Sequence, residues 1–314
     1  MNRVRRDIIN LEKNPNIPHE FEVNFDKKGI GKIILNFKRN ETLVKERENI
    51  RKRLKFKQPF KNVLYLYFDT VSRAHFIRQM PETVKFIKKY LSNPKIKSKE
   101  SISSFEFLKL NGLGKNTFPN NYPLFAGISK FRVHQSKGQT IGKNFKDIGY
   151  ITGTMNDIME KYTYYTFITS QDYMEKFTFG DPDHDGTTLF SDPNYYTYPS
   201  SLNGPYGIVF RCLYGKQVIE YLFDYTFAFW DAYIDQPKAF KSVNNYGHEF
   251  SMEVIRHADI LYKNFLEKFK KKGYFNNTIV YILSDHGHHV MPLYRLWFED
   301  YSYENILPFL FILG

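Results

Sequence analysis

Hydrophobic and polar positions alternate along the chain in blocks that predict strands and helices in turn. Residues 62–69 (NVLYLYFD) and 278–285 (TIVYILSD) are continuous apolar runs, each closed by an aspartate. Such runs are typical of strands that are buried on both faces of a sheet. We expect further strands at residues 105–110, 150–154, 238–244 and 306–313.

The segments between these runs favour helices. We expect long helices at residues 41–56, 72–90, 212–234 and 250–271, a short helix entered through Thr117, and another that ends before Gly149. Strands that alternate with helices are typical of a parallel sheet covered on both faces. The predicted fold class is therefore α/β, a three-layer α/β/α domain on a mainly parallel sheet.

The distribution of charge divides the chain into two segments, and its composition excludes some classes of protein. Residues 1–60 are rich in mixed charges and are predicted to form an extension, whereas residues 61–314 form the domain. A hydrophobic content of 42% excludes disorder of the whole chain. No apolar run has the length of a membrane span, and no apolar stretch follows the first basic residues as in a signal peptide.

The formal net charge of +12 favours anionic partners, such as phosphate or sulfate esters, nucleic acid or an acidic surface. The same excess is expected from an AT-rich genome, since lysine, asparagine, tyrosine and phenylalanine are all frequent. In residues 1–60 glutamates are interleaved with the bases and no aromatic platform accompanies them. We therefore expect no nucleic-acid partner.

Candidate chemistry gathers where predicted strands end. Asp69 and Asp285 each close an apolar strand, and the carboxyl ends of parallel strands share one crevice. Asp285 is followed by His286, and a carboxylate with an imidazole suits Zn²⁺, Mn²⁺ or iron. The alternatives are a helix N-cap for Asp69 and a plain polar turn for the Asp285–His286 pair.

Two further residues are chemical candidates. Thr117 stands where a glycine-bearing loop enters a helix, so it is either an ordinary N-cap or a nucleophile beside an anion-binding helix N-terminus. His248 follows the predicted strand at residues 238–244, and a single histidine in such a place is more often structural.

Taken together, these blocks resemble the DUF229 family of sulfatase-like proteins within the alkaline phosphatase superfamily. The resemblance extends from about residue 61 to residue 314. It rests on the blocks NVLYLYFDTVSR, LNGLGKNTFPNNYPLFAGI, GYITGTMND, RCLYGKQVIEYL, GHEF, IVYILSDHG and ENILPFLFIL.

The resemblance implies a role for each matching residue. Asp69, Asp285 and His286 would hold one divalent metal ion, with the hydroxyl of the nucleophile Thr117 as its fourth ligand. His248 matches a ligand of a second metal ion in two-metal relatives. The ions would be Zn²⁺, Mn²⁺ or Ca²⁺, one or two in number.

Asn116 would orient the oxygens of the ester. Asn244 stands where two-metal relatives carry an aspartate, so it would be a weak ligand at most. Those relatives also have a histidine well downstream of SDHG, which this chain lacks. We therefore expect either a single metal ion or a domain that continues beyond residue 314.

The implied function is metal-dependent hydrolysis of a phosphate or sulfate ester through Thr117. Dedicated sulfatases use a modified cysteine as nucleophile, and the single cysteine, Cys212, lies far from that position. The threonine thus favours phosphoryl transfer. The alternative is a catalytically inactive remnant that serves as a binding or surface protein. The family resemblance suggests a secretory or extracellular location, and the oligomeric state is left open.

Overall fold

The computed structural model describes residues 20–28, 31–55, 60–91, 100, 102–127, 140–157, 179, 182–186, 189, 212–249, 252–289 and 303–314. Its strands are β1 (Phe21–Phe25), β2 (Gly31–Leu35), β3 (Asn62–Phe68), β4 (Ser104–Glu106), β5 (Ile151–Asn156), β6 (His184–Asp185), β7 (Cys212–Leu213), β8 (Lys216–Gln217), β9 (Lys238–Asn244), β10 (Thr278–Ser284) and β11 (Leu310–Leu313). Its α-helices are α2 (Glu41–Leu54), α3 (Arg73–Gln79), α4 (Pro81–Lys89), α6 (Thr117–Ala126), α7 (Ile141–Asp147), α10 (Val218–Ala232) and α11 (Asp259–Lys271). Short 3₁₀ helices are η4 (Tyr246–His248), η5 (Val254–Ala258) and η6 (Tyr274–Asn277).

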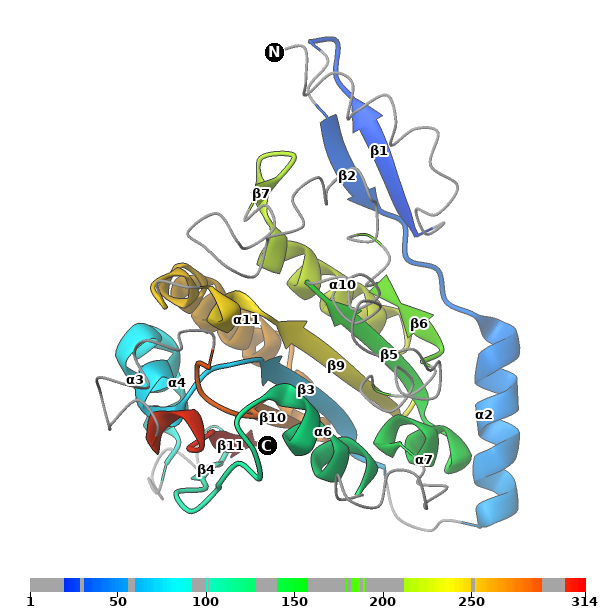
Figure 1. Ribbon diagram of the computed structural model, residues 1–314. Helices are drawn as coiled ribbons and strands as arrows, with labels where there is room; N and C mark the ends of the chain where they lie inside the picture. Colours follow the sequence, from blue (N-terminus) through cyan, green and yellow to red (C-terminus); the bar gives the residue numbers. More distant parts are fainter. Residues whose placement is uncertain are drawn as a thin grey trace.

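A seven-stranded sheet forms the centre of the molecule, in the order β4-β11-β10-β3-β9-β5-β6 (Figure 1). Strands β10, β3, β9, β5 and β6 are paired in parallel, whereas β11 runs antiparallel to both of its neighbours. The mainly parallel sheet predicted from the sequence is thus confirmed. The middle strands β3 and β9 are buried along their whole length. This explains the continuous apolar run of β3, whereas β9 also buries the polar residues Lys238, Lys241 and Ser242.

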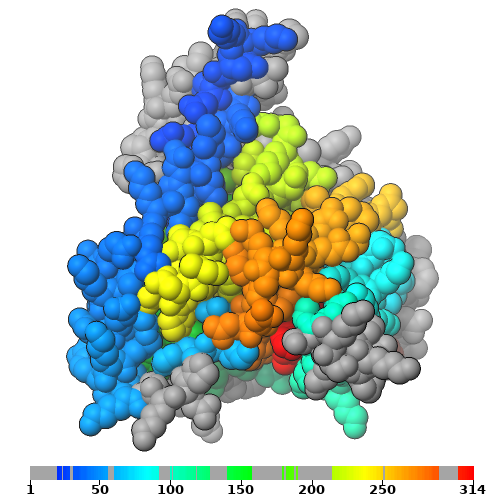
Figure 2. All heavy atoms as spheres, turned by 180° about the vertical axis from the view of Figure 1, so that it is seen from behind, coloured from blue at the N-terminus to red at the C-terminus, as the bar shows by residue number. Residues whose placement is uncertain are grey.

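Helices cover both faces of this sheet, as the three-layer prediction required. On one face α10, α11 and α4 lie side by side. This face is turned to the viewer in Figure 2, which shows the molecule from the side opposite to Figure 1. Aromatic side chains fill that layer, for example Phe229 of α10 against Phe240 of β9, with ring centroids 5.1 Å apart. On the other face Phe125 of α6 packs against Tyr65 of β3 at 6.0 Å. The α6 layer is the one that carries Thr117.

Two of the predicted helices have different bounds because turn residues interrupt them. The helix expected at residues 72–90 is divided into α3 and α4, with Met80 between them and Pro81 as the first residue of α4. Proline cannot continue a helix but suits its first turn. The helix expected from Cys212 begins only at Val218, because residues 212–217 form the β7–β8 hairpin. Tyr214 and Gly215 have positive φ there, as a tight hairpin turn requires.

Other boundaries shift by a few residues. Helix α11 begins at Asp259 after the 3₁₀ turn η5, whereas the sequence predicted a start at Phe250, which lies outside the described residues. The strand expected at residues 105–110 is the shorter β4. Within the described residues, no helix has the length and apolar character needed to cross a membrane.

Helix α2, in the predicted N-terminal extension, is fastened to the sheet by a buried ion pair. Arg47 is 5% exposed, and its Nη2 atom lies 2.6 Å from Oδ1 of Asp183. The other carboxylate oxygen of Asp183 accepts hydrogen bonds from the backbone N–H and hydroxyl of Thr152 on β5. The carboxylate thus joins α2 to the edge of the sheet.

We predict that Arg47→Ala lowers the free energy of unfolding by about 2 kcal/mol, because it removes the partner at 2.6 Å from the buried carboxylate of Asp183 and leaves it only the longer ion pair with Lys146, at 3.2 Å. Arg53→Ala on the exposed side of the same helix is the matched control, and should change stability by less than about 0.5 kcal/mol. Urea denaturation of both variants measures the difference. Equal losses would show that the ion pair does not fasten α2.

Candidate metal centre

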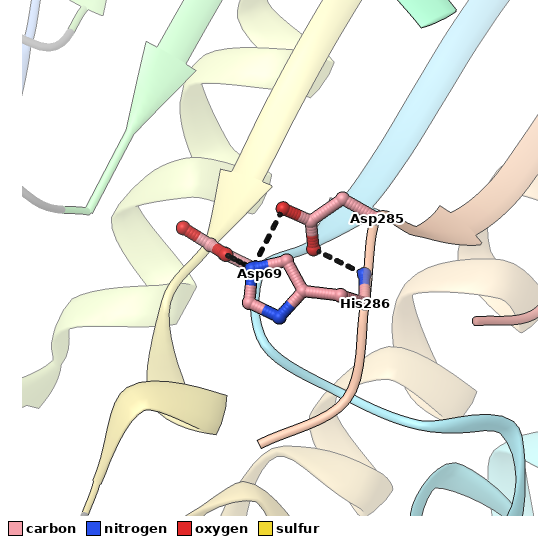
Figure 3. A group of neighbouring side chains, drawn as sticks. All are labelled: Asp69, Asp285 and His286. Carbon is pink, nitrogen blue, oxygen red and sulfur yellow. Dashed lines mark hydrogen bonds and ion pairs between the residues drawn. The ribbon is translucent and has the colours of Figure 1, made fainter. Parts of the chain in front are cut away.

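The two aspartates that close apolar strands lie side by side. Strands β3 and β10 are paired in parallel up to Phe68 and Ser284, so the next residues, Asp69 and Asp285, emerge at the same edge of the sheet. Both are buried. Ligand atoms of Asp69, Asp285 and His286 all lie within 4.8 Å of one another (Figure 3). The structure therefore brings together three of the residues predicted to hold a metal ion.

The ring of His286 is oriented by the backbone. Its Nδ1 atom lies 2.6 Å from the carbonyl oxygen of Gly287. Because a carbonyl only accepts, Nδ1 carries a hydrogen, which leaves Nε2 as the nitrogen that could bind a metal ion. Nε2 lies 3.2 Å from Oδ2 of Asp285 and 3.8 Å from Oδ1 of Asp69. Nε2 thus faces the carboxyl groups and would offer its lone pair to a bound metal ion, while Nδ1 stays bonded to the backbone.

Asn305 supports the same backbone carbonyl. Its side-chain Nδ2 lies 2.9 Å from the carbonyl oxygen of Gly287, 3.1 Å from that of His288 and 3.3 Å from that of Lys115. Lys115 belongs to the loop that leads to Thr117. One buried amide therefore joins this loop to the loop that follows β10. Sequence reasoning missed Asn305, because nothing in its local pattern distinguishes it from an ordinary turn residue.

Thr117 is the first residue of α6 and points its hydroxyl into the same cluster. Its Oγ1 atom lies 3.1 Å from Oδ1 of Asp69 and 3.1 Å from Nε2 of His286. The preceding residue, Asn116, is extended and exposed, and its side chain does not cap the helix. Asn116 is therefore the N-cap residue of α6 by its backbone alone, directly before Thr117.

The loop before α6 is held by the helix itself. The side chain of Asn120 accepts from the N–H groups of Leu113 and Gly114, at 2.6 and 3.2 Å. It also donates to the carbonyls of Gly114 and Asn116, at 2.9 and 2.8 Å. A side chain at Gly114 would clash with Pro119. The glycine and the asparagine together fix where α6 starts, and hence where the Thr117 hydroxyl lies.

His248 contacts the other oxygen of Asp69. Its Nε2 atom lies 3.0 Å from Oδ2 of Asp69 and 2.9 Å from the hydroxyl of Thr70. Asn244 ends β9 nearby, and its backbone carbonyl accepts from the N–H of Asp69 at 2.9 Å. The side-chain oxygen of Asn244 accepts from the N–H of Tyr246 at 3.0 Å. This oxygen, predicted as a weak ligand, thus accepts one hydrogen bond within the turn.

The two buried carboxyl groups have opposite electrostatic environments. Burial, and then the charge of Asp69, raises the pKa of Asp285 well above its ordinary value. Burial alone would also raise the pKa of Asp69, but His248, His286 and the hydroxyl of Thr70 hold it well below its usual range. Burial would lower the pKa of His248, whereas the contact with Asp69 raises it. Without a cation, Asp69 is thus the charged member of the pair.

The donor set fits a divalent cation. Two carboxyl groups, an imidazole nitrogen and a hydroxyl oxygen converge on one volume. A bound cation would counteract the burial and the charge of Asp69 that together raise the pKa of Asp285. A mixed oxygen and nitrogen set suits Zn²⁺ or Mn²⁺ better than Ca²⁺, which prefers oxygen ligands alone.

One more carboxyl group lies near this edge, and the sequence prediction did not include it. Asp157 follows β5 directly, just as Asp69 and Asp285 follow their strands. It is buried, and burial raises its pKa to about 7 against the opposing hydrogen bonds from Asn245. The other two aspartates were selected because ligands gather at the carboxyl ends of parallel strands. This strand-end rule could have found Asp157 as well.

His289 lies at the mouth of the cluster. Its ring centroid is 4.8 Å from that of His286 and 5.6 Å from that of His248. Burial, followed by the neighbouring His286, lowers the pKa of His289 to about 3, so its imidazole is neutral at physiological pH. A neutral, partly exposed imidazole there can accept or donate a hydrogen bond to a ligand.

A groove of about 640 Å³ lies elsewhere, between α4 and α11. It is lined by Glu82, Lys85, Phe86, Lys89, Tyr90, Lys263, Glu267, Lys270 and Lys271. Lys89 and Lys270 are paired with Glu100, and Lys263 is paired with Glu267. None of the predicted catalytic or metal-binding residues lines this groove. The candidate site is therefore the cluster formed by Asp69, Thr117, Asp285 and His286.

We predict a pH-dependent stability difference between the wild type and Asp157→Asn in the presence of a chelator. The pKa of Asp157 rises from its ordinary 3.8 to about 7 on folding, so between these values the native state binds more protons than the unfolded state. The wild type should therefore lose about 2 to 4 kcal/mol relative to the variant between pH 4 and pH 7. Urea denaturation at both pH values measures this change. A difference that is the same at both would contradict it.

Comparisons with known proteins bear on the whole chain. A family model described as "Protein of unknown function (DUF229)" matches residues 22–313. No curated protein matches the chain significantly.

Solved structures share its fold at low sequence identity. An alkaline phosphatase superfamily protein from Vibrio parahaemolyticus is 15% identical with a TM-score of 0.52, and the match covers 89% of this chain and 70% of that one. The putative sulfatase yidJ from Bacteroides fragilis is 14% identical with a TM-score of 0.50, over 83% of this chain and 69% of that one. The chain therefore belongs to the DUF229 family and has the fold of the alkaline phosphatase superfamily.

Proposed function

We propose that the protein hydrolyses phosphate or sulfate esters, with Thr117 as nucleophile and with a divalent cation held by Asp69, Asp285 and His286. The observation that supports this most is the position of the Thr117 hydroxyl, 3.1 Å from both a carboxylate oxygen and an imidazole nitrogen. An ordinary N-cap threonine would instead bond the backbone of its own helix. The fold shared with the alkaline phosphatase superfamily is consistent with this chemistry but does not identify a substrate.

The residues of the chain would divide the reaction into two displacements. In the first, Oγ1 of Thr117 forms a bond to the phosphorus or sulfur, and the bond to the leaving-group oxygen breaks. In the second, water attacks the same centre, the threonyl ester is cleaved and the hydroxyl is restored. When bound, the cation would lower the pKa of the attacking hydroxyl and neutralise charge on the ester.

The start of α6 would bind the non-bridging oxygens of the ester. Backbone N–H groups of a helix N-terminus favour anions, and the exposed amide of Asn116 stands beside them. Threonine in place of the modified cysteine of dedicated sulfatases favours phosphate over sulfate. The net charge of +12 also favours an anionic substrate.

Thr117→Ala is expected to reduce hydrolysis of aryl phosphate and aryl sulfate esters on the order of 10³-fold or more, because no hydroxyl remains to attack. Thr117→Ser, which keeps the hydroxyl, should retain activity within about tenfold. Thr140→Ala is the matched control: it removes the N-cap of α7, should cost about 1 kcal/mol of stability, and should leave turnover unchanged. Assays with Zn²⁺, Mn²⁺ or Ca²⁺ measure the rates, and an active Thr117→Ala variant would contradict the assignment.

A bound cation should also stabilise the fold. We expect Zn²⁺ or Mn²⁺ at a hundred times its dissociation constant to add about 2.7 kcal/mol to the free energy of unfolding, and a chelator to remove it. Asp285→Asn should lose this response, whereas Asp147→Asn on the exposed surface of α7 should keep it. Thermal denaturation with and without the metal ion measures the shift. An equal response in both variants would show that the ion binds elsewhere.

These two experiments also separate the catalytic proposal from the non-catalytic alternative. A wild type that is stabilised by the cation through Asp285, but hydrolyses neither ester with any of the three ions, would favour a binding protein that retains the metal centre.

A further inference from the structure

The carboxyl group of Asp157 is bound to a single residue of the neighbouring strand end. Its Oδ1 atom accepts from the backbone N–H of Asn245 at 2.9 Å and from the side-chain Nδ2 at 2.6 Å, and its Oδ2 atom lies 3.2 Å from the same backbone N–H. Asn156 adds a further acceptor, 2.6 Å from the same Nδ2. Both Asp157 and Asn245 are buried. The end of β5 is thus tied to the turn that follows β9.

That turn carries His248. The carbonyl of Asn245 accepts from the backbone N–H of His248 at 3.0 Å. The residue before it, Asn244, accepts from the N–H of Asp69 at 2.9 Å. Asp157 thus holds Asn245 by its N–H groups, and the carbonyl of Asn245 in turn holds the backbone of His248.

The position of the His248 ring depends on this backbone. The ring is held at Nε2 by Asp69 and by the hydroxyl of Thr70, at 3.0 and 2.9 Å. Its Nδ1 atom is buried and makes no hydrogen bond within the part of the chain that the structure describes. No second hydrogen bond therefore fixes the ring from behind, in contrast to His286. The backbone placement of the turn must supply that restraint.

Asp157 suits this task because a carboxylate only accepts. Its two close contacts are donors of Asn245 to Oδ1, and the backbone N–H of Asn245 also lies 3.2 Å from Oδ2. An asparagine at position 157 would keep the oxygen but would turn its NH₂ group toward that backbone N–H, donor against donor. A buried carboxyl group is costly unless its hydrogen bonds are satisfied, as they are here. A cross-link that served stability alone would not require so costly a group.

We propose that Asp157 is a positioning residue that fixes His248 against Asp69 through Asn245. The inference rests on the proposed function, in which Asp69 is a ligand and His248 lies at the same centre. Displacement of a group by about 1 Å can reduce a rate by on the order of 100-fold, so the contact at 3.0 Å is sensitive to the turn. Asp157 would act on the reaction without touching the substrate.

A double-mutant cycle with His248 tests the proposal. Asp157→Asn should lower kcat for the aryl ester about tenfold while KM changes less than about twofold. In the His248→Ala background the same substitution should cause no further loss, because the residue through which it acts is gone. Equal losses in both backgrounds would overturn the proposal.

A second readout does not depend on turnover. The ring resonance of His248, assigned by its absence from His248→Ala, should shift or broaden in Asp157→Asn and stay unchanged in the exposed control Asp147→Asn. If the wild type hydrolyses no ester, the proposed function fails, and the resonance still tests the link between Asp157 and His248. If the wild type is active and the resonance is the same in Asp157→Asn, the positioning role fails alone.

Discussion

The close approach of the buried carboxyl groups of Asp69 and Asp285 is the constraint that the rest of the site must satisfy. Parallel pairing of β3 with β10 forces these residues together, whatever their charge. The backbone N–H groups of Thr70 and His286 meet one carboxyl group at 3.2 and 2.8 Å, and His248 meets the other at 3.0 Å. Two buried carboxyl groups this close together cost free energy in the absence of a cation, and a bound cation would offset that cost.

The fold was largely predictable because its signals are local. Continuous apolar runs identified the central strands, and their alternation with helices identified the layers. The errors arose where a single turn residue mattered more than the apolar pattern. Pro81 divides a predicted helix, and the pair Tyr214–Gly215 turns a predicted helix start into a hairpin. Strand β6 was not predicted, because two residues are too few for a periodic signal.

The candidate site was predictable in part. The strand-end rule alone selected Asp69 and Asp285, whereas Thr117 and His248 were distinguished from ordinary turn residues only by the family resemblance. Asp157 follows β5 and so satisfies the same rule, but no local pattern reports its contact with Asn245, 88 residues later, or the contacts of Asn305. Contacts of this kind are tertiary, so sequence periodicity does not reveal them.

The order of strands in the sheet also has a consequence for how the chain folds. Strand β3 lies between β9 and β10, and Thr70 at its end bonds Asp285, 215 residues later. During synthesis β3 is made long before either neighbour, so this apolar strand must wait without a sheet partner. Pairings between distant segments form slowly, and unpaired apolar strands are prone to aggregation. The nascent chain should therefore be most prone to aggregation before β9 emerges from the ribosome and offers β3 its first partner.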